Sequence, residues 1–127
     1  MKLEEISLNE YEEFINNLGI KNTLIRMNNR SYIGIKENNK LIGVDMIGTA
    51  KRKTFGKYAF YSAVGPIFSR KDKEVLDFYI NNIKEYVKNH NGYVFILGEN
   101  ISNKYGLEKE YQITRHYKLM KFFESLR

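Results

Sequence analysis

Apolar residues at spacings of three and four predict two amphipathic helices in this chain. The first runs over Leu8–Leu18 and follows Ser7 and Glu10, which stand at the spacing of a capping box. Gly19 then offers the left-handed conformation that ends many helices. The second helix covers Asp72–His90. Its apolar positions fall on one face and are Val75, Leu76, Tyr79, Ile80, Ile83, Tyr86 and Val87.

Segments rich in Tyr, Ile and Val between the helices predict antiparallel strands. Ser31–Lys36 and Lys40–Gly48 form a hairpin, because Glu37-Asn38-Asn39 between them tolerates positive φ. Lys57–Ala63 resumes a strand and adds a second hairpin. Gly65-Pro66 then ends or bulges the sheet, since proline has no N–H group to donate to a neighbouring strand.

The remaining apolar segments are less regular. Tyr93–Leu97 is apolar without a break, which predicts a central strand covered on both faces. Beyond it we expect a short helix over Ile101–Glu108 and a strand over Gln112–Lys121, with a helix in that last segment left open. Leu24–Met27 is left unassigned. No repeat or linker divides residues 1–127, so the chain is expected to form one α+β domain.

Composition narrows the classes of function. The 127 residues include no cysteine, which excludes a disulfide framework, a thiolate metal site and a cysteine nucleophile. No zinc-binding or nucleotide-binding pattern is found, and no metal site is expected. No apolar run has the length of a membrane-spanning helix and the start lacks a signal-peptide core, so we expect a cytoplasmic protein without membrane insertion. The formal charge of +6 favours phosphate-bearing ligands, nucleic acid or acidic proteins as partners.

The order of these elements resembles the GNAT acetyltransferase fold, a mixed, mostly antiparallel sheet flanked by helices. Within it, Tyr61–Phe68, with its Gly-Pro turn, and the Asp72–His90 and Tyr93–Ile96 segments after it are similar to Fem-type aminoacyltransferases. These methicillin-resistance factors build peptidoglycan cross-bridges and carry two GNAT-like halves. The segments Tyr32–Lys36 and Leu41–Val44 resemble the first hairpin of the N-terminal half.

This resemblance implies transfer of an acyl or aminoacyl group to a substrate amine, in which proximity and strand-end N–H groups dominate. The donor would be acyl-CoA or aminoacyl-tRNA, and the acceptor a muropeptide. The chain departs from the family in supplying one half at most. It also reads Leu97-Gly98-Glu99-Asn100 where the family has an acidic residue followed by proline. Whether the chain catalyses a reaction by itself is therefore left open.

A phosphate-binding segment would lie between the second hairpin and the second helix. Its candidate residues are Gly65, Ser69, Arg70 and Lys71, which combine charge with the N–H groups of a helix start. The segment has one glycine, and Pro66 removes a donor. A solvated helix start is the competing interpretation.

Candidate acid and base residues are few. Glu99 follows the apolar Tyr93–Leu97 strand, where ligands of open α/β sheets gather, and is the first choice as a catalytic group. His116 is the second. His90 lies in the last helical turn, which favours a structural role. Asp45 interrupts an apolar strand, and we expect it on an exposed face of the hairpin, with a cation pair or a cleft position as alternatives.

A second hypothesis is a GNAT-fold protein without catalysis, of a plasmid or phage type, that binds a protein or nucleic acid. The segment Lys51-Arg52-Lys53, together with Arg115, Lys118, Lys121 and nearby tyrosines, would form a basic and aromatic surface for single-stranded nucleic acid. An unpaired half is also expected to form a homodimer through exposed apolar surface.

Overall fold

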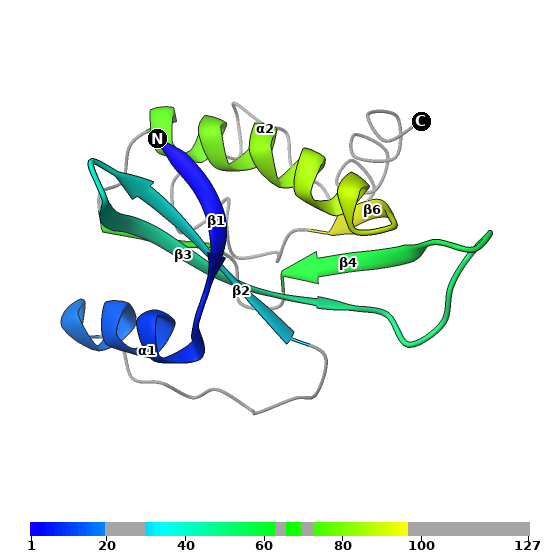
Figure 1. Ribbon diagram of the computed structural model, residues 1–127, viewed down its shortest axis with the longest axis horizontal. Coiled ribbons are helices and arrows are strands. Elements are labelled where there is room, and N and C mark those ends of the chain that lie inside the picture. The colour runs from blue at the N-terminus through cyan, green and yellow to red at the C-terminus, as the bar shows by residue number, and fades with distance from the viewer. Residues whose placement is uncertain (20–29, 63–65, 70–72, 97–127) are drawn as a thin grey trace.

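The computed structural model describes residues 1–19, 30–62, 66–69 and 73–96, which form one sheet with a helix on each face (Figure 1). Strands β1 to β4 are antiparallel to their neighbours, and β6 runs parallel to β4, giving the order β1-β2-β3-β4-β6 with β5 beside β3. The prediction of a mixed, mostly antiparallel sheet is confirmed. The elements are β1 (Lys2–Ile6), α1 (Leu8–Asn17), β2 (Arg30–Glu37), β3 (Lys40–Thr49), β4 (Tyr58–Ser62), β5 (Ile67–Phe68), α2 (Lys73–Asn89) and β6 (Gly92–Ile96).

Helix α1 begins and ends as its sequence predicts. The Ser7 hydroxyl accepts a hydrogen bond from the Glu10 N–H at 3.1 Å, and the Ser7 N–H donates to the Glu10 carboxylate at 3.2 Å. This reciprocal pair satisfies two N–H groups that a helix start leaves unpaired. Gly19, with φ of 73°, takes the left-handed conformation just after the helix.

Strand β1 was not predicted, because its residues are mostly charged. It pairs with β2 from Lys2 opposite Lys36 to Ile6 opposite Tyr32, and it places α1 against the sheet. Leu3 and Ile6 point to opposite faces of β1 and pack on different apolar clusters, while Glu4 pairs with Lys36 and Glu5 accepts a hydrogen bond from the Tyr86 hydroxyl. A charged end strand also discourages pairing with another sheet.

Both predicted hairpins form. Asn38 and Asn39 have φ of 52° and 64°, so the β2–β3 turn uses the positive φ that asparagine tolerates. In the second hairpin, β3 pairs with β4 from Ile47 opposite Ser62 to Thr49 opposite Phe60.

The second ladder is interrupted in the middle of β3. On the edge of β3 that faces away from β2, pairing resumes after Ser62 at β5, where Val44 lies opposite Ile67. Asp45 and Met46 are the two β3 residues between these pairings. Pro66, which precedes β5, is fully buried. The predicted break at Gly65-Pro66 therefore corresponds to a real interruption of the sheet, although Gly65 lies outside the described residues.

Two apolar clusters cover the two faces of the sheet. The larger lies under α2 and includes Val75, Leu76, Tyr79, Ile83, Val87 and the β6 residue Phe95. The smaller lies under α1 and contains Tyr11, Ile15, Val44, Met46 and Ile67.

Strand β6 is buried as predicted but is not central within the described residues. Val94 and Phe95 both have less than 4% of their surface exposed, although they are consecutive and point to opposite faces. In this part of the chain, however, β6 pairs with β4 alone, which places it at the end of the described sheet. The unassigned segment Leu24–Met27 and the elements predicted for Ile101–Glu108 and Gln112–Lys121 lie outside the described residues.

Candidate functional site

A buried carboxyl lies where the β3 ladder is interrupted. Asp45 is 1% exposed and points toward α2, where it accepts hydrogen bonds from the Ser62 hydroxyl at 2.7 Å and from the Tyr79 hydroxyl. The expectation that Asp45 lies on an exposed face is wrong. Its face of the hairpin is covered by α2, and two hydroxyl donors replace the water that the carboxyl loses.

The surroundings of Asp45 perturb its protonation. Burial raises the pKa of its carboxyl to about 7, while hydrogen bonds from Tyr79, Ser62 and the Met46 backbone act in the opposite direction. Burial and the neighbouring carboxyl also raise the pKa of the Tyr79 phenol well above its usual value. Because Asp45 is buried, it is not accessible to a ligand from solvent. Its hydrogen bonds to Ser62 and Tyr79 form a buried polar centre that joins β3, β4 and α2.

A groove of about 630 Å³ lies on the α1 side of the molecule. Its size is in the range of small-molecule and peptide sites. Residues of α1 line one part of it, residues at and beside the β2–β3 turn line another, and Ser69 after β5 also contributes. The residues that line it are Glu10, Glu13, Phe14, Asn17, Leu18, Lys36, Asn39, Lys40, Leu41 and Ser69.

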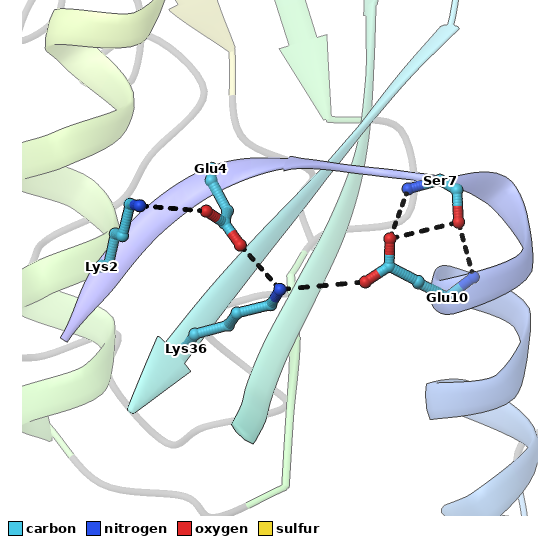
Figure 2. A network of polar contacts seen from close by, with 5 residues as sticks. All are labelled: Lys2, Glu4, Ser7, Glu10 and Lys36. Carbon is cyan, nitrogen blue, oxygen red and sulfur yellow. Dashed lines mark hydrogen bonds and ion pairs between the residues drawn. The ribbon is translucent and has the colours of Figure 1, made fainter. Parts of the chain in front are cut away.

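Ion pairs fix part of the groove's wall (Figure 2). The Lys36 ammonium lies 2.7 Å from a Glu4 oxygen and 3.9 Å from a Glu10 oxygen, and Lys2 lies 3.3 Å from Glu4. The hydrogen bond from Lys36, with a further one from Lys2, lowers the pKa of Glu4, and Glu4 raises the pKa of Lys36. Glu10 also belongs to the capping box with Ser7, so the start of α1 and the end of β2 are held by one set of contacts.

Two charged residues of the groove are left outside that network. Glu13 lies one turn along α1 from Glu10, and Lys40 lies just after the β2–β3 turn; both side chains are exposed. Within the described residues neither makes an ion pair. Glu13 and Lys40 are therefore the charges of the groove that are available to a ligand.

Of the predicted substrate-binding residues, Ser69 lies in this groove. Its N–H and hydroxyl both donate to the Ile42 carbonyl, at 2.9 and 3.2 Å. Ser69 therefore offers a ligand its hydroxyl oxygen as an acceptor, and its own N–H group is not free to hold a phosphate. Gly65, Arg70 and Lys71 lie outside the described residues.

The candidate acid and base residues Glu99 and His116 also lie outside the described residues. His90 has the structural role that was predicted. Its Nδ1 atom is 2.7 Å from the Tyr86 carbonyl oxygen, its ring stacks on Tyr86, and its Nε2 atom is 3.9 Å from Glu5.

Sequence reasoning missed the groove residues Glu13, Lys36 and Lys40. Each belongs to an element that was predicted, but no local pattern brings the face of α1 beside the β2–β3 turn. The β1 strand does so, and β1 was the element not foreseen. Within the described ranges, no group of three or more His, Asp or Glu side chains gathers to hold a metal ion. None of the helices described here has the length and apolar character needed to cross a bilayer.

Comparison with known protein families connects this geometry to one of them. The model of the FemAB family matches residues 7–126, which is nearly the whole chain. The chain belongs to the FemAB family. The resemblance to Fem-type enzymes that the sequence carries is thereby confirmed.

Two FemAB relatives are named aminoacyltransferases. The chain is 28% identical over 102 aligned positions to the aminoacyltransferase FemB of Staphylococcus epidermidis strain ATCC 12228, covering 71% of this chain and 24% of that protein. It is 24% identical to a second FemB from Staphylococcus epidermidis, with the same coverage. The chain thus spans about a quarter of the length of these FemAB relatives.

Solved structures of acetyltransferases share the fold of this FemAB chain. A ribosomal-protein-alanine N-acetyltransferase from Brucella melitensis biovar Abortus 2308 aligns with a TM-score of 0.63 and 11% identity, over 86% of this chain and 88% of that one. An aminoglycoside acetyltransferase from an uncultured soil metagenomic sample aligns with a TM-score of 0.61 and 13% identity, over 84% and 82%. The GNAT-like α+β fold predicted from the sequence is confirmed.

Proposed function

We propose that this chain is an acyl- or aminoacyltransferase-like domain that resembles one half of a Fem-type peptidoglycan bridge enzyme, and that its α1 groove holds the muropeptide acceptor. Membership of the FemAB family supports the class of reaction. The observation that carries the proposal is the groove itself. At one peptide-sized site it offers the Glu13 carboxylate and the Lys40 ammonium, and neither forms an ion pair with a described residue.

The chemistry of the groove suits a peptide. Glu13 would attract the amine of the acceptor, and Lys40 would attract a carboxylate or phosphate of the same molecule. The side chains of Asn17 and Asn39 each donate and accept hydrogen bonds, as backbone amides require. Leu41 and its apolar neighbours on α1 would cover aliphatic parts of the ligand.

The described groups of the groove would contribute by binding and orientation. Holding an amine close to an activated acyl group supplies a large part of the rate enhancement in transfer reactions. Donor binding is proposed for the segment before α2, where Gly65, Arg70 and Lys71 would hold the phosphates of acyl-CoA or aminoacyl-tRNA. Glu99 and His116 stay as the proposed acid and base. A cytoplasmic location also stays a proposal, as do a homodimer and the binding of nucleic acid or another protein.

Titration calorimetry with a UDP-linked muropeptide tests the acceptor site. We expect Glu13→Gln to weaken binding tenfold or more, because a charge-assisted hydrogen bond to the amine is lost. Glu12→Gln is the matched control, since it removes the same charge from the neighbouring position of α1, which does not line the groove. Equal weakening by both variants, or no heat with the parent chain, would remove the support for this site.

A single-turnover transfer assay then separates the two functional hypotheses. Transfer of an acyl group from acetyl-CoA or aminoacyl-tRNA to the muropeptide would establish an enzyme. Muropeptide binding without transfer would indicate a domain that holds the acceptor while other residues carry out the chemistry.

A further inference from the structure

The connection between β3 and β4 is a preformed hairpin that extends away from the sheet (Figure 1). Thr54 and Lys57 exchange two backbone hydrogen bonds of 2.8 and 3.0 Å across its tip. The two tip residues, Phe55 and Gly56, have φ of 52° and 78°. Positive φ at both central positions is typical of the tight turns that match the twist of a hairpin. The tip is therefore a built turn.

Phe55 is an unusual residue for its position. Its side chain is fully exposed, at 101% of the reference surface, and it makes no packing contact that would stabilise the fold. Asparagine or glycine would suit the positive φ better, because a Cβ atom is crowded in the left-handed region. Neither packing among the described residues nor the local backbone geometry explains a phenylalanine at this position.

Four cations flank Phe55 in the sequence of the hairpin tip. Lys51, Arg52, Lys53 and Lys57 are all exposed, and the tip segment contains no acidic residue. Lys53 lies over the ring of Tyr58, with its ammonium 5.1 Å from the ring centroid. Within the described residues none of the four forms an ion pair. Their charge is therefore uncompensated within the described residues, and the four positions lie within four residues of Phe55 in the sequence.

The arrangement distinguishes between two polyanions. A strand of nucleic acid is held by several rings on which successive bases stack. Here a cation already lies over each neighbouring ring, Lys53 over Tyr58 and Arg30 over Tyr61, both at 5.1 Å from the centroid, so Phe55 is the one fully exposed ring of the described tip. One apolar residue at an apex with cations behind it instead matches the layers of a membrane interface, where phosphates lie above the acyl chains.

We propose that the β3–β4 hairpin tip, residues 50–57, docks on a surface of anionic lipid, with Phe55 entering the headgroup region and the four cations meeting lipid phosphates. The docking is peripheral and requires no membrane-spanning segment. This lipid docking does not depend on the proposed transferase activity. A chain that binds no muropeptide could still bind lipid, and a chain that binds no lipid could still bind a muropeptide.

Sedimentation with vesicles of phosphatidylglycerol and phosphatidylcholine in equal parts tests this docking. We expect the 127-residue chain to bind these vesicles and to be released at high salt. Arg52→Gln should weaken binding about fivefold, as expected for one cation near an anionic surface. Lys88→Gln, which removes one exposed charge from α2, is the control and should leave binding unchanged.

Two substitutions of Phe55 separate the ring's role from folding. Phe55→Asn suits the positive φ, so it should keep or raise thermal stability while weakening vesicle binding roughly tenfold. Phe55→Trp introduces the only tryptophan of the chain, and its emission should shift to the blue with anionic vesicles alone. Equal binding to pure phosphatidylcholine, full binding by Phe55→Asn, or preferential binding of single-stranded RNA would each overturn the proposal.

Discussion

Replacing Asp45 by asparagine tests the polar centre that joins β3, β4 and α2. Burial raises the pKa of this carboxyl from 3.8 to about 7. Between these two values the folded protein keeps a proton that the unfolded chain has released. Stability therefore falls as pH rises through this window, and the loss is complete above the folded pKa. A shift of about three units corresponds to roughly 4 kcal/mol of the free energy of unfolding.

The Asp45→Asn variant removes this pH dependence of the free energy of unfolding, because asparagine has nearly the same shape as aspartate but does not titrate. Its side chain is neutral at every pH, its carbonyl oxygen can still accept from Ser62, and its NH₂ group can donate to the Tyr79 oxygen. We expect the parent protein to be at least as stable as the variant near pH 4.5. Near pH 8 the variant should be the more stable, because the parent alone keeps a buried charge.

Urea denaturation followed by far-ultraviolet circular dichroism provides the assay, since the chain has no tryptophan. Glu4 changes the stability in the opposite sense. Its pKa is lowered, so the stability that it contributes is lost as pH falls below about 4.5. The difference between parent and variant is therefore taken from pH 4.5 upward. If the difference in free energy of unfolding between parent and variant stays constant with pH, or moves in favour of the parent as pH rises, burial does not raise the pKa of Asp45.

Three further substitutions probe the scaffold, each measured by thermal and urea unfolding. Ser7→Ala removes the cap of α1 and should cost about 1 kcal/mol; an unchanged midpoint would mean that the ion pairs of Glu10 hold the helix start without the hydroxyl. Gly92→Ala places a Cβ 2.7 Å from the Val87 carbonyl oxygen and 2.7 Å from the Phe60 ring, and should cost about 2–3 kcal/mol. Gly19→Ala meets no atom within 4 Å and should cost only the strain of its positive φ, about 1 kcal/mol. Equal losses of stability at Gly92 and Gly19 would contradict the close packing of α2 and β4 against β6 at Gly92.

Local signals were sufficient for the helices and hairpins. The capping box at Ser7 and Glu10 determines where α1 begins, and the two asparagines at positions 38 and 39 determine the first turn. Strand β1 was missed because three of its five residues are charged and its two apolar residues do not alternate; pairing with β2 makes it a strand. Strand β5 has two residues, too few for any periodic pattern.

The site depended on contacts between segments far apart in sequence. Asp45 was expected at the surface because its hydroxyl donors, Ser62 and Tyr79, lie 17 and 34 residues away. The groove likewise needs the face of α1 beside the β2–β3 turn. Ser69 was the one predicted binding residue that the structure places in this groove, and it was chosen for its position before α2. Family resemblance supplied the class of protein, which no single residue of the chain establishes.

Amide chemical-shift mapping by NMR, with a UDP-linked muropeptide added to the chain, tests most directly whether the α1 groove is an acceptor site. We expect the largest shifts to cluster at Glu13, Asn17, Asn39, Lys40 and Ser69 and to saturate together with one dissociation constant. Shifts confined to residues away from α1 and the β2–β3 turn, or no shifts at saturating muropeptide, would contradict it.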